Sequence, residues 1–108
     1  MILTTTHNIE NFNIVDYLGI VTGTAYDSSY SSKGDKMSFK DMFSTSKYYE
    51  KYAIGLEFIK EKAFQNLKDN AKKLGANAVV GIQLDIEPVA NSTTLLVSIT
   101  GTAVKVEE

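Results

Sequence analysis

The segment Leu74–Glu87 constrains the fold more than any other part of the chain, because a helix ends and a strand begins within it. Gly75 follows the helical pattern, and glycine commonly follows a helix because it adopts a left-handed conformation without a Cβ penalty. Apolar and polar residues then alternate, which is typical of a strand with one buried and one wetted face. We expect one row to face the helix and the other to face away: Val80, Ile82, Leu84 and Ile86 against Gly81, Gln83, Asp85 and Glu87.

A long amphipathic helix is predicted over Tyr48–Leu74. Its apolar residues recur every three or four positions and so lie on one face: Leu56, Ile59, Ala63, Leu67, Ala71 and Leu74. Ser46 is its candidate N-cap. Ser38 and Asp41 have the spacing that starts a helix, so we expect a short helix before the long one.

Three further strands are predicted, over Ile2–Thr5, Ile14–Tyr26 and Leu95–Val106. The strand Ile14–Tyr26 is apolar on both faces, which favours burial on both sides. The order is β-β-α-β-β, which indicates an α+β fold with one long helix packed on an antiparallel sheet. The length of 108 residues suits a single domain spanning residues 1–108.

Composition excludes several classes of site. All 11 cations are Lys, and the absence of Arg disfavours bidentate recognition of phosphate or guanine. There is no Cys, so disulfides, thiolate catalysis and Cys-based metal sites are excluded. The basic excess lies on the helix, because residues 47–74 carry 7 Lys and 4 acids whereas residues 75–108 carry 1 Lys and 4 acids.

Neither a signal peptide nor a membrane span is expected. The N-terminus lacks a charged region followed by an apolar one. The apolar runs of the chain are only a few residues long, far short of the roughly 20 residues of a membrane-spanning helix. We therefore expect a cytoplasmic protein that contacts neither membrane nor nucleic acid.

Few residues are candidates for chemistry. His7 is the single histidine, and we interpret it as an exposed turn residue unless symmetry-related copies gather it at a metal. Asp85 and Glu87 share a strand face and could hold a hard cation, act as an acid–base pair, or form an ordinary polar face. Asp27, Asp35 and Asp41 lack the spacing of a calcium loop.

No sequence pattern identifies a reaction. Neither a nucleotide-binding glycine motif nor a nucleophile elbow is present, so we expect no enzyme and assign no catalytic and no cofactor-binding residue. The lysines of the helix are interpreted as a solvated surface. The tyrosines fit either a protein interface or packing of a loop over the sheet: Tyr17, Tyr26, Tyr30, Tyr48, Tyr49 and Tyr52.

One short pattern occurs twice. Thr22-Gly23-Thr24-Ala25 is repeated as Thr100-Gly101-Thr102-Ala103. One interpretation is that strand glycines permit a bulge or a close backbone approach at two places. The other is that the two strands meet around a site lined by threonine hydroxyls and glycine backbone.

Several of these segments together resemble the YbjQ family of small bacterial and archaeal proteins. The resemblance is carried by residues 1–6, Tyr17–Ala25, Leu74–Ile82 and Thr100–Val104, and it covers nearly the whole chain in order. It implies a dodecin-like α+β subunit that assembles into a homopentamer, with strands of neighbouring subunits packed around an axis. The family is functionally uncharacterised and described as binding heavy metals, and no ligand residue is carried over from it.

The sequence therefore predicts a homo-oligomeric, non-enzymatic module that binds a small ligand or a metal between subunits. The identity of any metal and its ligand residues stay open. The alternative is a structural or protein-interaction subunit without a bound ligand.

Overall fold

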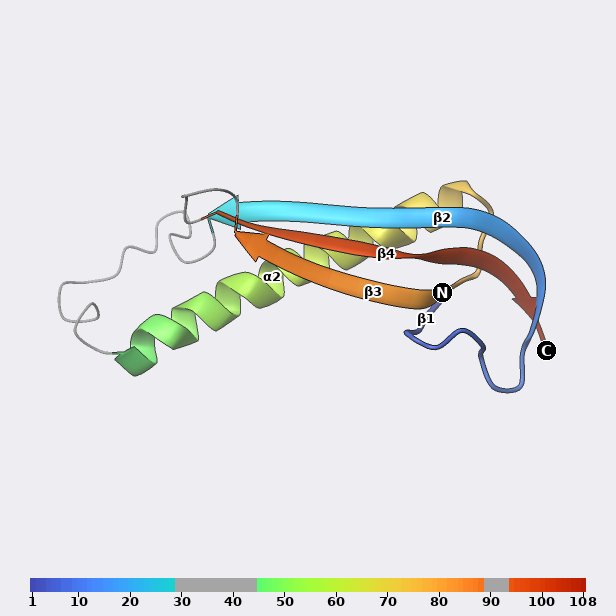
Figure 1. Ribbon diagram of the computed structural model, residues 1–108, viewed down its shortest axis with the longest axis horizontal. Coiled ribbons are helices and arrows are strands. Elements are labelled where there is room, and N and C mark those ends of the chain that lie inside the picture. The colour runs from blue at the N-terminus through green and yellow to red at the C-terminus, as the bar shows by residue number, and fades with distance from the viewer. Residues whose placement is uncertain (29–44, 89–93) are drawn as a thin grey trace.

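The computed structural model contains one long helix and four strands, in the order β1, β2, α2, β3, β4 (Figure 1). It describes residues 1–28, 45–88 and 94–108, and the side chains of residues 1–26, 55–88 and 94–108. The elements are β1 Ile2–Leu3, β2 Asn13–Ser28, α2 Thr45–Lys73, β3 Ala78–Pro88 and β4 Thr94–Glu107. The predicted α+β class and element order are therefore confirmed, whereas the short helix expected from Ser38 lies outside the described residues.

The four strands form one sheet in the order β1-β3-β4-β2. The two antiparallel pairs are β2 with β4 and β3 with β4. β1 pairs in parallel with β3, through Ile2 with Ala78 and Leu3 with Val79. The prediction of an antiparallel sheet was therefore wrong for this edge, since the N-terminal strand joins the sheet beside a distant part of the sequence.

Helix α2 covers one face of the sheet by packing on β2 and β4, and Figure 1 shows it crossing behind the strands. The predicted stripe is buried in this layer at Ile59, Ala63, Leu67 and Ala71. It packs against the row of β4 that contains Val97 and Ile99, in the main core cluster. Leu74 follows the end of α2 and is 44% exposed, so the buried stripe ends one turn earlier than predicted.

The N-terminal segment covers part of the opposite face. Four buried residues form a second cluster there: Ala78, Val80, Val104 and Val106. Ile2, Ile9, Phe12 and Ile14 pack against it from the N-terminal side. This cover lies at one end of β3 and β4, and we call the rest of that face the open face.

The turn from α2 into β3 has the predicted glycine stop. Gly75 has a φ of 84°, and its N–H donates to the carbonyl of Lys72 at 2.9 Å while the N–H of Ala76 donates to that of Ala71 at 3.1 Å. This is the Schellman pattern that satisfies the last carbonyls of a helix. Asn77 then lengthens the β3–β4 pairing, because its side chain both donates to and accepts from the backbone of Val106.

Bulges change which residues share a face. The register of β3 with β4 shifts between Val80 and Gln83, where Gly81 has a φ of 63°. Val80 consequently lies in the second cluster and Ile82 in the helix-facing one, so the predicted row that joined them was wrong. Two further shifts lie in β2, between Ile14 and Asp16 and between Tyr17 and Gly19, so this strand also departs from strict alternation.

Within the parts of the chain that the structure describes, no helix combines the length and apolar character needed to cross a bilayer. Ser46, the predicted N-cap, lies inside α2, whose first residue is Thr45.

Candidate functional site

The open face of the sheet contains two cross-strand rows of polar residues and a third row that is mixed. β4 lies in the centre, with β2 on one side and β3 on the other. Thr100 pairs with both Thr22 and Gln83, and Ser98 pairs with both Thr24 and Asp85. Leu96 in turn pairs with Tyr26 and Glu87. Residues directly opposite each other in antiparallel strands point to the same face, so these side chains lie together.

The repeated Thr-Gly-Thr-Ala pattern is divided between the two faces. β2 and β4 pair so that Thr22 lies opposite Thr100 and Val21 lies opposite Gly101. The threonines are on the open face, and the glycines are on the face that carries α2. A Cβ on Gly23 would lie 2.8 Å from Cβ of Leu67 and would overlap the helix backbone, so this glycine permits close approach of α2. The interpretation of a close backbone approach is therefore confirmed at Gly23, and a site lined by the threonine hydroxyls stays a prediction.

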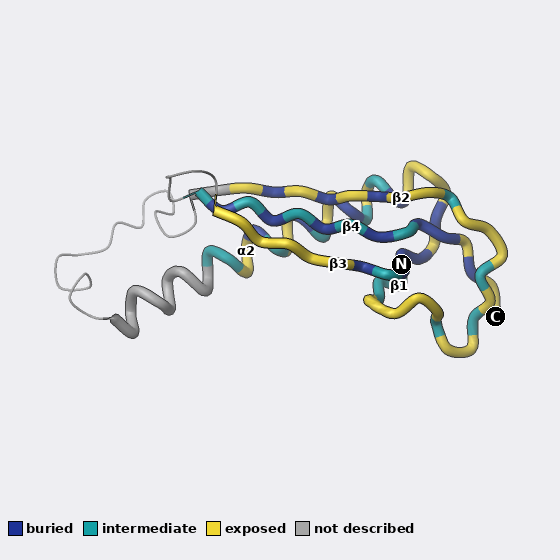
Figure 2. The backbone as a smooth tube through the Cα atoms, viewed as in Figure 1, coloured by how far each residue is buried: buried dark blue, intermediate teal, exposed yellow. Residues whose placement is uncertain are grey.

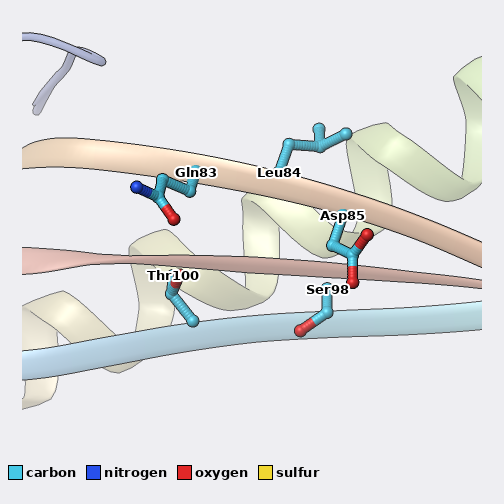
Figure 3. Close-up of a pocket in the computed structure, with 5 residues that line it drawn as sticks. All are labelled: Gln83, Leu84, Asp85, Ser98 and Thr100. Atoms are coloured by element: carbon cyan, nitrogen blue, oxygen red, sulfur yellow. The ribbon is translucent and has the colours of Figure 1, made fainter.

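A groove of about 400 Å³ lies over β3 and β4 on the open face. It is lined by Gln83, Leu84, Asp85, Ser98 and Thr100 (Figure 3). Figure 3 shows the polar ends of Gln83 and Asp85 directed across the strands toward Thr100 and Ser98, and Leu84 directed away from them. The groove therefore gathers one carboxylate, one amide and two hydroxyls in a space open to solvent.

The polar groups of this groove are free to bind. No side-chain hydrogen bond joins Gln83, Asp85, Ser98 or Thr100 to another of the described residues. Gln83 and Asp85 are exposed, and Ser98 and Thr100 are half-buried. All four can offer oxygen atoms, which are the ligands preferred by hard cations such as Ca²⁺ and Mg²⁺, and they can also hydrogen-bond a small polar molecule.

Among the described residues, the helix leaves the outer part of β3 exposed. Leu84 and Ile86 pair with Ile99 and Val97, which belong to the helix-facing core, yet Leu84 is 42% and Ile86 36% exposed. Figure 2 shows exposed residues running along the outer part of β3, beside the alternating pattern of β4. Within the described part of the chain, α2 packs mainly on β2 and β4, which accounts for this exposure.

A second exposed apolar region lies on β2. Ile20 is 81% exposed, and Tyr17 and Tyr26 are 69% and 72% exposed. Burial of this strand was predicted on both faces, by a helix on one and by another sheet or a subunit on the other. Val21 and Ala25 are buried on the helix face, whereas Ile20, Tyr17 and Tyr26 are exposed in the single chain. Tyr30 and the side chains of Tyr48, Tyr49 and Tyr52 lie outside the described residues.

The other candidate residues are not brought together with the groove. His7 is exposed in the N-terminal turn region, and its ring lies beside the bulge at Gly81. Glu87 lies on the same strand face as Asp85 but does not line the groove. Asp35, Asp41 and the side chain of Asp27 lie outside the described residues. Among the described residues, no group of three or more His, Asp or Glu side chains is arranged to hold a metal ion.

The sequence analysis did not single out Ser98, which lines the groove, or Asn66 and Asn70, which bind the backbone of β2. Ser98 was not singled out, although its period-two spacing from Thr100 places both hydroxyls on one side of the strand. Asn66 and Asn70 were not singled out, although their i, i+4 spacing marks one helix face. Their amide groups donate to the carbonyls of Thr24 and Thr22, each at 2.8 Å.

These features define a small α+β domain with an open, hydroxyl-rich sheet face. The YbjQ family model, described as "Putative heavy-metal-binding", matches residues 1–107. A UPF0145 protein of Halalkalibacterium halodurans is 37% identical over 107 residues, which are 97% of this chain and 95% of the relative. The chain therefore belongs to the YbjQ family.

A solved structure confirms the fold over the same extent. A crystal structure of a protein of unknown function from Pediococcus pentosaceus, assigned to the DUF74 family, has a TM-score of 0.63. The match covers 99% of this chain and 98% of that one, at 20% sequence identity. At this identity the likeness supports the arrangement of strands and helix, and no more.

Proposed function

We propose that the protein is a homo-oligomeric, non-enzymatic binding module that takes up a hard cation or a small polar ligand between subunits. The observation that carries the proposal is the groove of Gln83, Asp85, Ser98 and Thr100, whose polar groups have no partner among the described residues. The uncovered apolar residues Leu84 and Ile86 lie on the same strand. A binding surface and a surface for a second subunit are thus adjacent.

The donor set supports a hard rather than a soft ligand. A carboxylate, an amide carbonyl and hydroxyls suit Ca²⁺ or Mg²⁺, whereas soft heavy metals select thiolate and thioether ligands. The sequence contains no Cys, so no thiolate can take part. The groove therefore does not fit the heavy-metal description of the family, although neighbouring copies could add further oxygen donors.

Self-association is supported by the exposed apolar residues. Leu84 and Ile86 on β3, and Ile20 on β2, leave apolar surface at both sides of the sheet. A domain of this size has a modest core, so burying such surface against further copies stabilises it. A homopentamer, the assembly implied by the family resemblance, is the form that we propose, and a cytoplasmic location belongs to the same proposal.

Native mass spectrometry tests both parts together. The spectrum would be recorded after exposure to Ca²⁺, Mg²⁺ or Zn²⁺, with and without chelator. We expect a pentamer that gains mass with a hard cation or retains a small polar ligand. A pentamer that stays ligand-free after metal exposure and after purification from cell extract would contradict the binding part.

Two variants locate the ligand. Asp85→Asn removes the one carboxylate of the groove while keeping its shape, and should weaken cation binding at least about tenfold, since a hard cation depends on the anionic oxygen. Glu87→Gln removes a charge from the same strand face outside the groove and is the matched control. Equal weakening by both substitutions would show a diffuse charge effect rather than a site.

The alternative is a protein-interaction subunit without a ligand, favoured by the exposed rings of Tyr17 and Tyr26. Tyrosine is enriched at protein interfaces because it offers both an apolar ring and a polar tip. This alternative predicts that Tyr26→Ser changes the assembly or partner binding while no ligand is ever retained. Unchanged assembly of that variant, together with a bound ligand, would reject it.

A further inference from the structure

The open face is negatively charged around the groove. Successive cross-strand rows cover this part of the sheet, from the row of Ile20 to the row of Tyr26. Asp85 and Glu87 are the charged side chains of these described rows, and none of the rows contains Lys. The described lysines of α2 belong to the helix that packs on the other face. The charge of the open face therefore favours a cationic ligand.

The groove itself gathers acceptors for hydrogen bonds. Figure 3 shows the oxygen of the Gln83 amide turned toward Thr100, and the carboxylate of Asp85 turned toward Ser98. A carboxylate and an amide oxygen accept hydrogen bonds, and hydroxyl groups can accept them as well. An ammonium group has three N–H donors and no acceptor, so these side chains can satisfy it completely. The bond to the carboxylate is the strongest of them, because both of its partners are charged.

A metal ion finds fewer ligands in this groove than it requires. Ca²⁺ takes about six to eight oxygen ligands, and Mg²⁺ takes about six in a nearly ideal octahedron. The groove provides oxygen atoms from Gln83, Asp85, Ser98 and Thr100, and Asp85 is its one carboxylate. In the described parts of the chain, no three His, Asp or Glu side chains are grouped to hold a metal ion. An organic ammonium ion, which needs fewer acceptors, therefore fits the groove better.

Apolar surface lies next to the carboxylate of the groove. The row that follows Asp85 and Ser98 contains Leu96, with Tyr26 beside it on β2. Leu96 is half-buried, and Tyr26 is 72% exposed. Two residues along a strand span about 7 Å, so a short carbon chain reaches this row from an ammonium group held at Asp85. The face of a tyrosine ring attracts both apolar groups and cations.

We propose that the groove binds the ammonium group of a primary organic amine. Asp85, Ser98 and Thr100 accept its hydrogen bonds, and its apolar stem runs over Leu96 toward Tyr26. This inference rests on the proposed function and names the class of its ligand. The carboxylate selects for charge, because a neutral alcohol of the same shape makes no charge-assisted bond. The apolar row selects for the stem, because removing apolar carbon from water is favourable.

Isothermal titration calorimetry of the unaltered, assembled protein at pH 7 tests the inference with three probes: n-hexylamine, hexan-1-ol and methylamine. Hexan-1-ol keeps the stem without the charge, and methylamine keeps the charge with little stem. We expect n-hexylamine to bind at least about tenfold more tightly than either, because the charged bond and the apolar contacts both add to affinity. Equal affinities for n-hexylamine and hexan-1-ol would overturn the inference.

Two pairs of variants locate the amine. Asp85→Asn should weaken n-hexylamine binding at least about tenfold, whereas Glu87→Gln, in the next row, should weaken it less than about threefold. Tyr26→Ser should weaken n-hexylamine binding at least about threefold without affecting methylamine, whereas Ile20→Ser, at the opposite end of these rows, should affect neither. Equal losses for Asp85→Asn and Glu87→Gln, or loss of both amines in Tyr26→Ser, would overturn the inference.

Titration of the same protein with Ca²⁺ and Mg²⁺ separates the failure of this inference from that of the proposed function. If a metal ion binds in a manner that depends on Asp85 while n-hexylamine does not bind, the inference is overturned and the proposed function stands. If neither the amine nor a metal ion binds, and the protein retains no ligand from cell extract, both are overturned.

Discussion

The two faces of the sheet are built from the same strands and differ in how far one chain completes them. On the helix face, Gly23 lets α2 approach, and Leu67 and Ile99 are fully buried. On the open face, Thr22 and Thr24 of β2 remain exposed to solvent. Over β2 and β4 the helix face is therefore a buried core, whereas the open face stays in contact with solvent.

This difference shows how a short repeated pattern can serve two purposes. In Thr-Gly-Thr-Ala, the period of two sends threonines to one side and the small residues to the other. The small residues bring the helix close, which gives stability. The hydroxyls remain as hydrogen-bonding groups, which can give function. We therefore expect substitutions on the two faces to separate stability from binding.

The largest expected effect is that of Gly23→Ala. The added methyl group would meet backbone atoms around Ala63 and Leu67, which cannot rotate away, so we expect a loss of about 3 kcal/mol in the free energy of unfolding. Urea denaturation measures it. Thr24→Ala, on the opposite face of the same strand, is the control and should change stability by less than about 0.5 kcal/mol. Similar losses for the two would mean that the faces do not differ as described.

An intermediate effect is expected when Asn66 and Asn70 are both replaced by alanine. Each amide contributes one hydrogen bond to the β2 edge, worth about 1 kcal/mol, so the pair should lower the unfolding free energy by about 2 kcal/mol. Thermal denaturation followed by circular dichroism measures the loss. Gln65→Ala removes only a bond to Asp69 within the helix and should cost a few tenths of a kcal/mol, about the value of such pairs. Equal losses for the double variant and for Gln65→Ala would show that the hydrogen bonds to β2 add nothing to stability.

The smallest effect on stability is expected for Thr100→Val, which keeps the shape of a groove residue and removes its hydroxyl. Since this side chain is half-buried without a described hydrogen bond, we expect a change within about 0.5 kcal/mol. Ligand retention in native mass spectra should nevertheless fall. If the Thr100→Val variant loses stability but keeps its ligand, the open face serves stability rather than binding, which contradicts the roles given to the two faces.

The sequence predicts where the helix and the strands lie better than it predicts which residues of a strand share a face. The stripe from Ile59 to Ala71 and the alternation of β4 are regular, so local periodicity was enough to place them. In β3 the bulge at Gly81 inserts a residue and moves Val80 to the opposite face from Ile82. An isolated glycine within a strand is a signal for such a bulge, and it was present in the sequence.

The pairing of strands could not be predicted in the same way. β1 joins β3 in parallel through contacts between Ile2 and Ala78, which depend on the folded arrangement and not on a local pattern. The groove was only half predicted. Asp85 was identified as a candidate, whereas its combination with Ser98 and Thr100 depends on the β3–β4 register after the bulge.

The central proposal is that Leu84 and Ile86 of β3, which are exposed in the described part of a single chain, are covered by further copies. Sedimentation equilibrium at micromolar concentration tests this most directly. We predict a mass of several chains, five in the proposed form. A single-chain mass at that concentration would contradict the account.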